Sequence, residues 1–188
     1  YVILNAYDPI TTCSSSVTLK IPTCCLTSGI AINNKKASDV LQDPSYSGYI
    51  INGNQFYTNT EIVVNGIFTV DVPFEFLNCS NLNFGANAYT YIEPGQTLTY
   101  DNTRVLGKCD TMWEGNHISN VTATLKIING SIIQQAKRAV YSISGGNYFI
   151  EGSTLQNNYR DIVVSAYLGS HPGIVRNTDF TMPGNFLP

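Results

Sequence analysis

The sequence predicts an all-β protein, a right-handed parallel β-helix (solenoid) of about five or six coils. A segment pattern returns about every 24 residues, short apolar runs alternate with Gly, Asn or Pro-Gly turns, and no stretch has convincing helical length. One coil cannot bury its apolar side chains alone, whereas stacked coils share a continuous interior. The alternative is an antiparallel β-sandwich, which also has short strands and regular turns but gives no reason for one corner to recur.

The recurring segment reads apolar, any, apolar, any, Asn or Gly, small, any, apolar. Its copies lie at 74–82, 98–105, 125–132 and 148–155, with a looser one at 174–180. A second set of apolar runs lies at 62–64, 89–92, 117–119, 139–143 and 162–165. Each period therefore carries two or three short strands, with alternate side chains pointing into the solenoid.

The fifth position of the segment is predicted to form a structural corner ladder. Asn tolerates left-handed backbone geometry, and its side chain can bond the Asn of the next coil. We expect these side chains to point inward, in register on successive coils. The ladder residues are Asn78, Asn102, Asn129, Gly152 and Asn177.

The first third of the chain fits the repeat poorly. Residues 1–60 are predicted to be an N-terminal cap or irregular first coils, and 61–188 to be the β-helix coils, continuous with the cap as one domain. The apolar, β-prone start is a candidate assembly strand, made of Tyr1, Val2, Ile3 and Leu4. It is expected to pair with a neighbouring chain or with continuing coils; the alternative is that it folds back on its own first coil.

The composition favours some partners over others. Charged residues make up 12% of the chain, the net charge is -3, and 10 Lys+Arg cannot form a broad surface for nucleic acid. No apolar run approaches the ~18 residues of a membrane span. Asn, Thr and Ser supply more than a quarter of the chain. Such an uncharged polar surface is common in extracellular β-proteins and predicts a secreted or cell-surface location.

Three motifs resemble the right-handed parallel β-helix modules of large secreted or surface proteins of Bacteroidota. They are Gly95-Gln96-Thr97-Leu98-Thr99, Cys109-Asp110-Thr111-Met112-Trp113-Glu114-Gly115 and the segment Ser131 to Val140. The resemblance covers about half of the chain. It implies export, often through type IX secretion, and a modular role at the cell surface, but no particular activity.

We expect no catalytic site and no cofactor. β-Helix lyases and hydrolases need clustered acids, or acids with calcium, on neighbouring coils, and the acids here do not stack. Arg138 and Arg160 align, but a solvated edge meeting Asp161 is favoured over a site. His117 and His171 lie about two coils apart without a second ligand, which argues against a metal.

Aromatic residues supply the candidate glycan contacts. Trp113, Tyr89 and Tyr91, together with Tyr141, could form a strip against the apolar face of a sugar. The favoured alternative is that Trp113 fills a coil corner and the tyrosines cover a flank.

The pairing of the cysteines stays open at this point. Cys79 occupies the small-residue place after a corner and is expected to be a buried side chain. The five candidates for disulfides are Cys13, Cys24, Cys25, Cys79 and Cys109.

These observations predict a non-enzymatic extracellular structural or adhesive module. It would self-assemble into a fibre or surface stalk, or continue into a larger surface protein. The alternative is a glycan-binding or glycan-cleaving β-helix protein.

Overall fold

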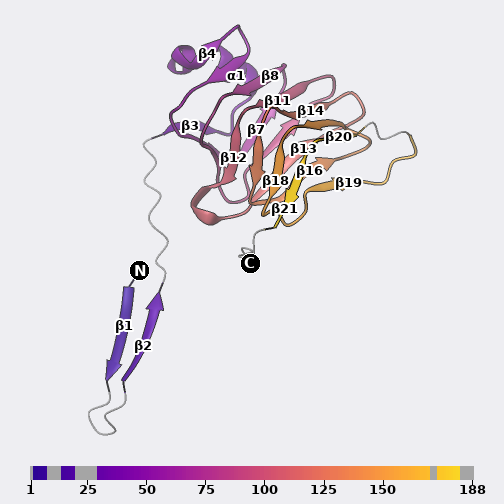
Figure 1. Ribbon diagram of the computed structural model, residues 1–188. Helices are drawn as coiled ribbons and strands as arrows, with labels where there is room; N and C mark the ends of the chain where they lie inside the picture. Colours follow the sequence, from indigo (N-terminus) through magenta and orange to yellow (C-terminus); the bar gives the residue numbers. More distant parts are fainter. Residues whose placement is uncertain (1, 8–13, 20–28, 170–172, 183–188) are drawn as a thin grey trace.

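The protein is a parallel β-solenoid of about five turns, as the repeat predicts, so the antiparallel sandwich is wrong. The computed structural model describes residues 2–7, 14–19, 29–169 and 173–182. Three sheets run along the solenoid, and successive coils contribute one strand to each sheet (Figure 1).

Sheet 1 has five parallel strands, in the order β7 (Ile67–Val70), β10 (Tyr89–Ile92), β13 (Trp113–Ile118), β16 (Ala136–Ser142) and β19 (Ile162–Val164). Sheet 2 has seven strands, in the order β4 (Ile50–Ile51), β5 (Gln55–Tyr57), β8 (Phe74–Leu77), β11 (Thr97–Asp101), β14 (Thr124–Ile128), β17 (Asn147–Glu151) and β20 (Ile174–Arg176). Only its β4–β5 pair is antiparallel. Sheet 3 has seven parallel strands, in the order β3 (Ile30–Asn33), β6 (Ile62–Asn65), β9 (Leu82–Phe84), β12 (Arg104–Gly107), β15 (Ile132–Gln134), β18 (Thr154–Gln156) and β21 (Asp179–Thr181).

The register of sheet 2 reproduces the sequence repeat. Phe74 pairs with Leu98, Leu98 with Leu125, and Leu125 with Tyr148. Phe149 then pairs with Ile174. Subtraction of the paired numbers gives steps of 24, 27, 23 and 25 residues, which match the predicted steps. The unequal coils keep one register in sheet 2 because the surplus residues lie outside its strands.

The interior is apolar and aromatic, because every second strand residue points inward. In β11 the buried side chains are Leu98 and Tyr100, and their neighbours are half-buried. Tyr100 stacks on Phe76 of the preceding coil at 5.8 Å between ring centroids. The fully buried Asn116 is an exception, which accepts hydrogen bonds from Thr90 and Tyr100 and donates one to the Ala139 carbonyl.

The predicted corner residues share a left-handed backbone, but their side chains do not point inward. The φ angles are +52° at Asn78, +46° at Asn102 and +56° at Asn129. Gly152 and Asn177 continue the series at +56° and +47°. Asn102 donates to Asn78 Oδ1 at 2.7 Å, yet both it and Asn129 are exposed to solvent. Asn129 Nδ2 donates to Asp101 Oδ1 instead of to the next Asn.

The small residue after the corner is the one that points inward. Cys79 and Thr103 are buried, as are Ser131 and Ser153 on the following coils. The Thr103 hydroxyl donates to the Phe76 carbonyl at 2.8 Å and accepts from the Cys79 N–H at 3.2 Å. A left-handed residue turns the chain sharply, so its own side chain faces out and the next one faces the interior. Gly130 is an extra exposed residue in its coil, and Ser131 takes the inward place.

Helical segments cover one end of the solenoid, while β3 and β5 already belong to its sheets. The helix α1 (Ala37–Gln42) and the 3-10 helix η1 (Pro44–Tyr49) follow β3 and lie at that end (Figure 1). Ala37, Val40 and Tyr46 are buried in the common core. The coil region therefore reaches back to Ile30, inside the segment expected to be a cap or irregular first coils.

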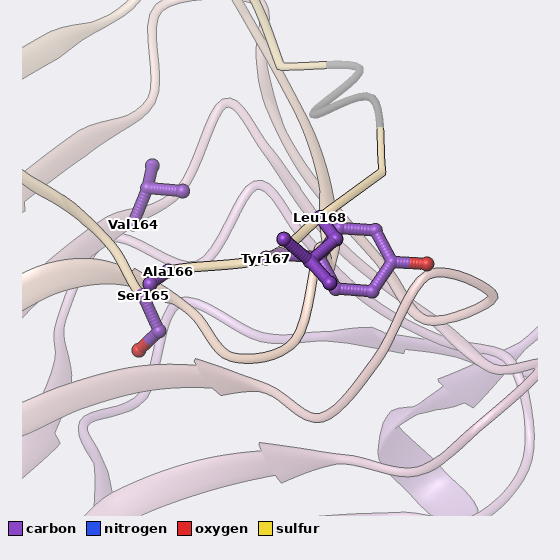
Figure 2. A pocket seen from close by; sticks show the side chains of 5 residues that line it. All are labelled: Val164, Ser165, Ala166, Tyr167 and Leu168. Atoms are coloured by element: carbon purple, nitrogen blue, oxygen red, sulfur yellow. The ribbon is translucent and has the colours of Figure 1, made fainter.

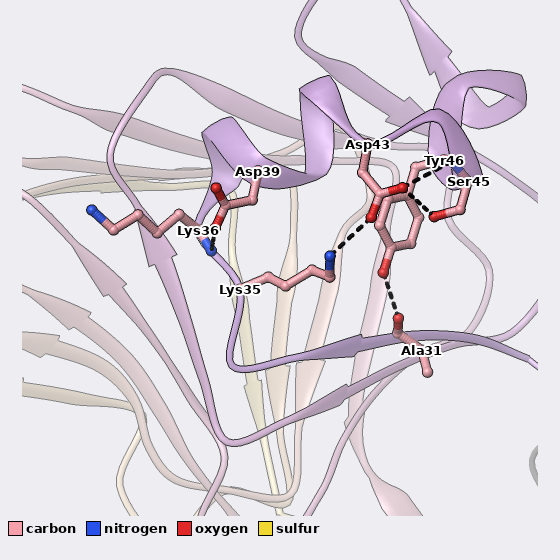
Figure 3. A network of polar contacts seen from close by, with 7 residues as sticks. All are labelled: Ala31, Lys35, Lys36, Asp39, Asp43, Ser45 and Tyr46. Carbon is pink, nitrogen blue, oxygen red and sulfur yellow. Dashed lines mark hydrogen bonds and ion pairs between the residues drawn. The ribbon is translucent and has the colours of Figure 1, made fainter.

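Polar contacts hold these helices in place (Figure 3). The Tyr46 hydroxyl donates to the Ala31 carbonyl at 2.7 Å, and Lys35 pairs with Asp43 at 2.9 Å. Asp43 also accepts from the Ser45 hydroxyl and N–H. The hydroxyl bond, followed by the Lys35 bond and then the N–H bond, lowers the pKa of Asp43 to about 2. Asp71, after β7, accepts two hydrogen bonds from Ser38 and so ties α1 to sheet 1.

The candidate assembly strand is described from Val2 to Leu4, because Tyr1 lies outside the described residues. It belongs to β1 (Val2–Tyr7), which pairs antiparallel with β2 (Ser14–Leu19) in a separate two-stranded sheet. Among the described strands, neither pairs with the solenoid.

Candidate functional site

The outer face of sheet 1 carries a row of rings from three successive coils. Alternation buries Thr90, Asn116 and Ser142, so the neighbouring Tyr89, His117 and Tyr141 project outward. The rings of Tyr89 and His117 stack with centroids 4.6 Å apart. The His117 and Tyr141 rings meet edge to face at 5.3 Å. We call these three residues the ring row.

His117 acts in this row as a neutral ring. Burial, with a smaller contribution from the Arg138 charge, lowers the pKa of His117 to about 4, although the Glu114 carboxylate works in the opposite direction. Its Nε2 atom is buried and has no hydrogen-bond partner. The imidazole is therefore uncharged near neutral pH, which argues against a general acid, and its contacts with the Tyr89 and Tyr141 rings favour a packing role.

A β-bulge lies beside the ring row. Gly115 pairs with Arg138, whereas Asn116 pairs with Val140, so Ala139 is an extra residue in β16. Gly115 has φ +105°, and a Cβ there would collide with the Arg138 carbonyl oxygen. A bulge breaks the alternation of side chains and can re-aim them.

The bulge gathers two cations around one carboxylate. Lys137 Nζ contacts Glu114 Oε1 at 2.6 Å, and Arg138 Nη2 contacts Glu114 Oε2 at 3.3 Å. The Lys137 hydrogen bond is the main cause that lowers the pKa of Glu114. The Arg138 guanidinium also lies over the Tyr141 ring, 4.3 Å from its centroid. The ion cluster and the ring row therefore form one continuous surface.

A shallow hollow of about 250 Å³ opens at this cluster. Its lining residues are Glu114, Lys137, Arg138, Tyr159 and Arg160. Arg160 stands over the Tyr159 ring at 5.5 Å, and Tyr159 is 59% exposed. We call these five residues the basic hollow. It presents three cationic groups and one carboxylate.

A second hollow of about 590 Å³ follows β19 and is mostly apolar (Figure 2). Five consecutive residues line it, and Figure 2 shows Leu168 next to the Tyr167 ring. The lining residues are Val164, Ser165, Ala166, Tyr167 and Leu168. This hollow offers apolar contacts but no charged group.

The structure separates the three predicted glycan contacts. Tyr89 and Tyr91 are half-buried on sheet 1 and face outward. Trp113 is fully buried, stacks on Phe84 at 4.3 Å and donates its Nε1–H to the Gln134 carbonyl. It lies in the interior, which excludes Trp113 as a glycan contact and agrees with the packing role that was the favoured alternative.

The predicted arginine edge has a different partner. Arg138 pairs with Glu114, and Asp161 Oδ1 accepts from Asn158. Sequence reasoning passed over Glu114 and Lys137, because nothing in the residue types reveals the bulge that brings them together. His171 lies outside the described residues.

The described cysteines behave differently from each other. Cys79 is a free, buried thiol, as its corner position predicts, and burial raises its pKa to about 11. Cys109 is disulfide-bonded, so the two are not bonded to each other. Cys13, Cys24 and Cys25 lie outside the described residues.

Within the described ranges, no group of three or more His, Cys, Asp or Glu could hold a metal ion. Likewise, none of the described helices is long and apolar enough to cross a membrane. No protein-family model, curated protein or solved structure matches the chain.

Proposed function

We propose that the protein is a non-enzymatic extracellular structural or adhesive module that joins a second copy through the open end of its solenoid. The proposal rests on one observation, the unpaired strand edges and exposed apolar side chains of the last described coil. Among the described strands, β19, β20 and β21 each form the edge of a sheet. Val175 and Phe180 are 39% and 50% exposed, whereas their partners one coil earlier, Ile150 and Leu155, are fully buried.

The two ends of the solenoid differ, which sets the geometry of association. The helices α1 and η1 cover the interior at the β3 end, so head-to-tail stacking of copies is blocked there. Two open ends can meet around a two-fold axis, where each copy offers the same edges and apolar side chains. Such an isologous contact closes at a dimer. In a longer chain, further coils would occupy the same end.

Several features support an extracellular setting. The disulfide of Cys109 is typical of an oxidising compartment. The uncharged polar surface is common in extracellular β-proteins. The low net charge of -3 also keeps repulsion between copies weak, which favours their association. The sequence resemblance to surface modules of Bacteroidota adds export, through type IX secretion, to the proposal.

The test is the particle mass as a function of protein concentration. In the variant Val175→Lys/Phe180→Lys, charges replace the half-exposed side chains of the last coil. Val121→Lys is the matched control, because Val121 is 38% exposed but lies in the turn before β14. We expect light scattering to show dimers for the unchanged protein and for the control, and single chains for the double variant. Single chains in all three samples, at every concentration up to the millimolar range, would refute the open-end contact.

A further inference from the structure

We propose that the basic hollow and the ring row together bind an anionic polysaccharide, with its carboxylate or sulfate groups at the arginines and its sugar rings against the exposed Tyr159 ring and the outer surface of the ring row. The inference goes beyond the structural role, because it concerns the side of the solenoid and not its open end. It rests on three observations: the charge of the hollow, the spacing of the rings, and the bulge that connects them.

The charge of the hollow favours an anion. Lys137, Arg138 and Arg160 face one carboxylate, that of Glu114, which leaves an excess of two positive charges in the lining. No carboxylate of the described residues pairs with Arg160. Its nearest acid in sequence, Asp161, accepts from Asn158 and does not line the hollow. A guanidinium offers a planar fork of donors that matches the two oxygens of a carboxylate or sulfate.

The aromatic groups favour a saccharide as the carrier of that anion. Tyr159 offers an exposed ring next to Arg160, and Tyr141 lies beneath Arg138. From there Tyr141, His117 and Tyr89 continue over successive coils, which are about 4.8 Å apart in a sheet. A linear polymer lying along the coils would meet one residue of the ring row per coil. The ring that offers a face to a sugar is Tyr159, which is 59% exposed, whereas Tyr89 and His117 stack on each other and add contact along the same line.

The β-bulge places the cationic side chains of β16 on the same face of the strand. Without the extra residue Ala139, Lys137 and Arg138 would lie on opposite faces of β16. Gly115 permits the close approach of the Arg138 carbonyl. Bulges occur preferentially next to sites where a side chain must be re-aimed.

Other anionic polymers fit less well. Nucleic acid needs a broad basic surface, whereas the chain has 10 Lys+Arg against 13 Asp+Glu. Three cations in one hollow recognise a locally placed anionic group, and the ring row extends the contact without further charge.

The experiment measures binding of the full chain to three polysaccharides by calorimetry or biolayer interferometry. Heparin carries sulfate and carboxylate groups, polygalacturonate carries carboxylates only, and dextran is neutral. The test variant is Tyr159→Ala/Arg160→Ala, at two exposed positions. Its matched control is Tyr57→Ala/Lys126→Ala, which removes one tyrosine and one cation from the exposed residues of sheet 2.

We expect heparin, polygalacturonate or both to bind, dextran not to bind, and added salt to weaken binding. The test variant should lose at least tenfold in affinity, while the control should stay within twofold. Binding of heparin alone would assign the site to sulfated glycans, and binding of both to uronic acids as well. Val175→Lys/Phe180→Lys should bind as the unchanged protein does, so this inference can fail independently of the open-end contact.

Two outcomes would overturn the inference. One is that neither acidic polysaccharide binds more tightly than dextran. The other is that binding survives in Tyr159→Ala/Arg160→Ala. Tighter binding of duplex DNA or of anionic lipid vesicles through the same two residues would replace the polysaccharide by that ligand.

Discussion

The Tyr100 hydroxyl donates a hydrogen bond of 2.8 Å to Asn116 Oδ1 in the interior of the solenoid. Thr90 donates to the same oxygen at 2.7 Å, and the amide nitrogen of Asn116 donates to the Ala139 carbonyl. All four groups are on adjacent coils, so the interior polar network links sheet 1 to sheet 2. Burial of these groups is tolerated only because each one has a partner.

Asn116→Ala should therefore destabilise the protein strongly. The change leaves the Thr90 and Tyr100 hydroxyls without an acceptor and opens a small cavity, at a cost of about 2–5 kcal/mol in the free energy of unfolding. Tyr100→Phe should cost only about 1 kcal/mol, because Asn116 keeps its bond from Thr90. Urea unfolding of both variants measures the difference. Equal losses in the two variants would contradict the role assigned to Asn116.

The left-handed corner predicts that two substitutions of Asn102 differ in their effect on stability. Asn102→Gly should leave the free energy of unfolding within about 0.5 kcal/mol of its original value, because glycine adopts φ +46° readily. Asn102→Leu should cost about 1–2 kcal/mol, because a branched side chain is strained there. Thr103→Val, at the inward position, should cost at least as much by removing the acceptor of the Cys79 N–H. Denaturant unfolding of the three variants gives the ranking.

The pKa of His117 makes stability sensitive to acid. Its folded-state pKa of about 4 lies below the unfolded value of about 6.5, so the unfolded chain binds a proton more readily between these pH values. The stabilisation is complete above about pH 6.5 and is lost as the pH falls to about 4. The loss is at most about 3 kcal/mol, and about half of that once partial exposure of the ring is allowed for.

His117→Phe isolates this contribution, because it keeps a ring in the row but removes the titrating group. The melting temperatures of the variant and the unchanged protein should converge or cross as the pH falls from 7 to 4. Parallel curves would show that His117 does not titrate in this interval. Glu114 adds an acid-sensitive part to both curves, because its lowered pKa also favours the folded state above that pKa.

Gly115 is expected to be the glycine least tolerant of substitution in the ring-row region. A Cβ there would meet the Arg138 carbonyl oxygen, in addition to the strain of φ +105°. Gly95→Ala is the comparison, since Gly95 has φ +79° but open space around its Cβ position. Gly95→Ala should cost about 1 kcal/mol, and Gly115→Ala about 3 kcal/mol or more. Thermal melts of the two variants would reveal whether the close approach matters beyond the backbone angle.

The strand pattern and the coil steps were readable from the residues because the inward positions of sheet 2 are apolar or aromatic in successive coils. The direction of the corner side chains was not readable, since it depends on the φ angle of residues such as Asn102 and on which neighbour takes the interior place. Trp113 illustrates a second limit, because the residue type alone does not show whether an aromatic side chain packs inside or faces a ligand. The basic hollow could not be predicted, because it depends on the bulge at Ala139. One added residue does not reveal itself in the composition or in the repeat period.

The two ends of the solenoid differ in their contacts, so the coils are expected to unfold in order from one end to the other. Each coil touches mainly its two neighbours, so coils can detach one at a time from whichever end is held least firmly. Among the described strands, those of the coil with β19, β20 and β21 pair on one side only, whereas the first coil is held by α1 and η1. Amide hydrogen exchange in sheet 2 should therefore be fastest at Ile174–Arg176, and its rate should decrease coil by coil toward Phe74–Leu77.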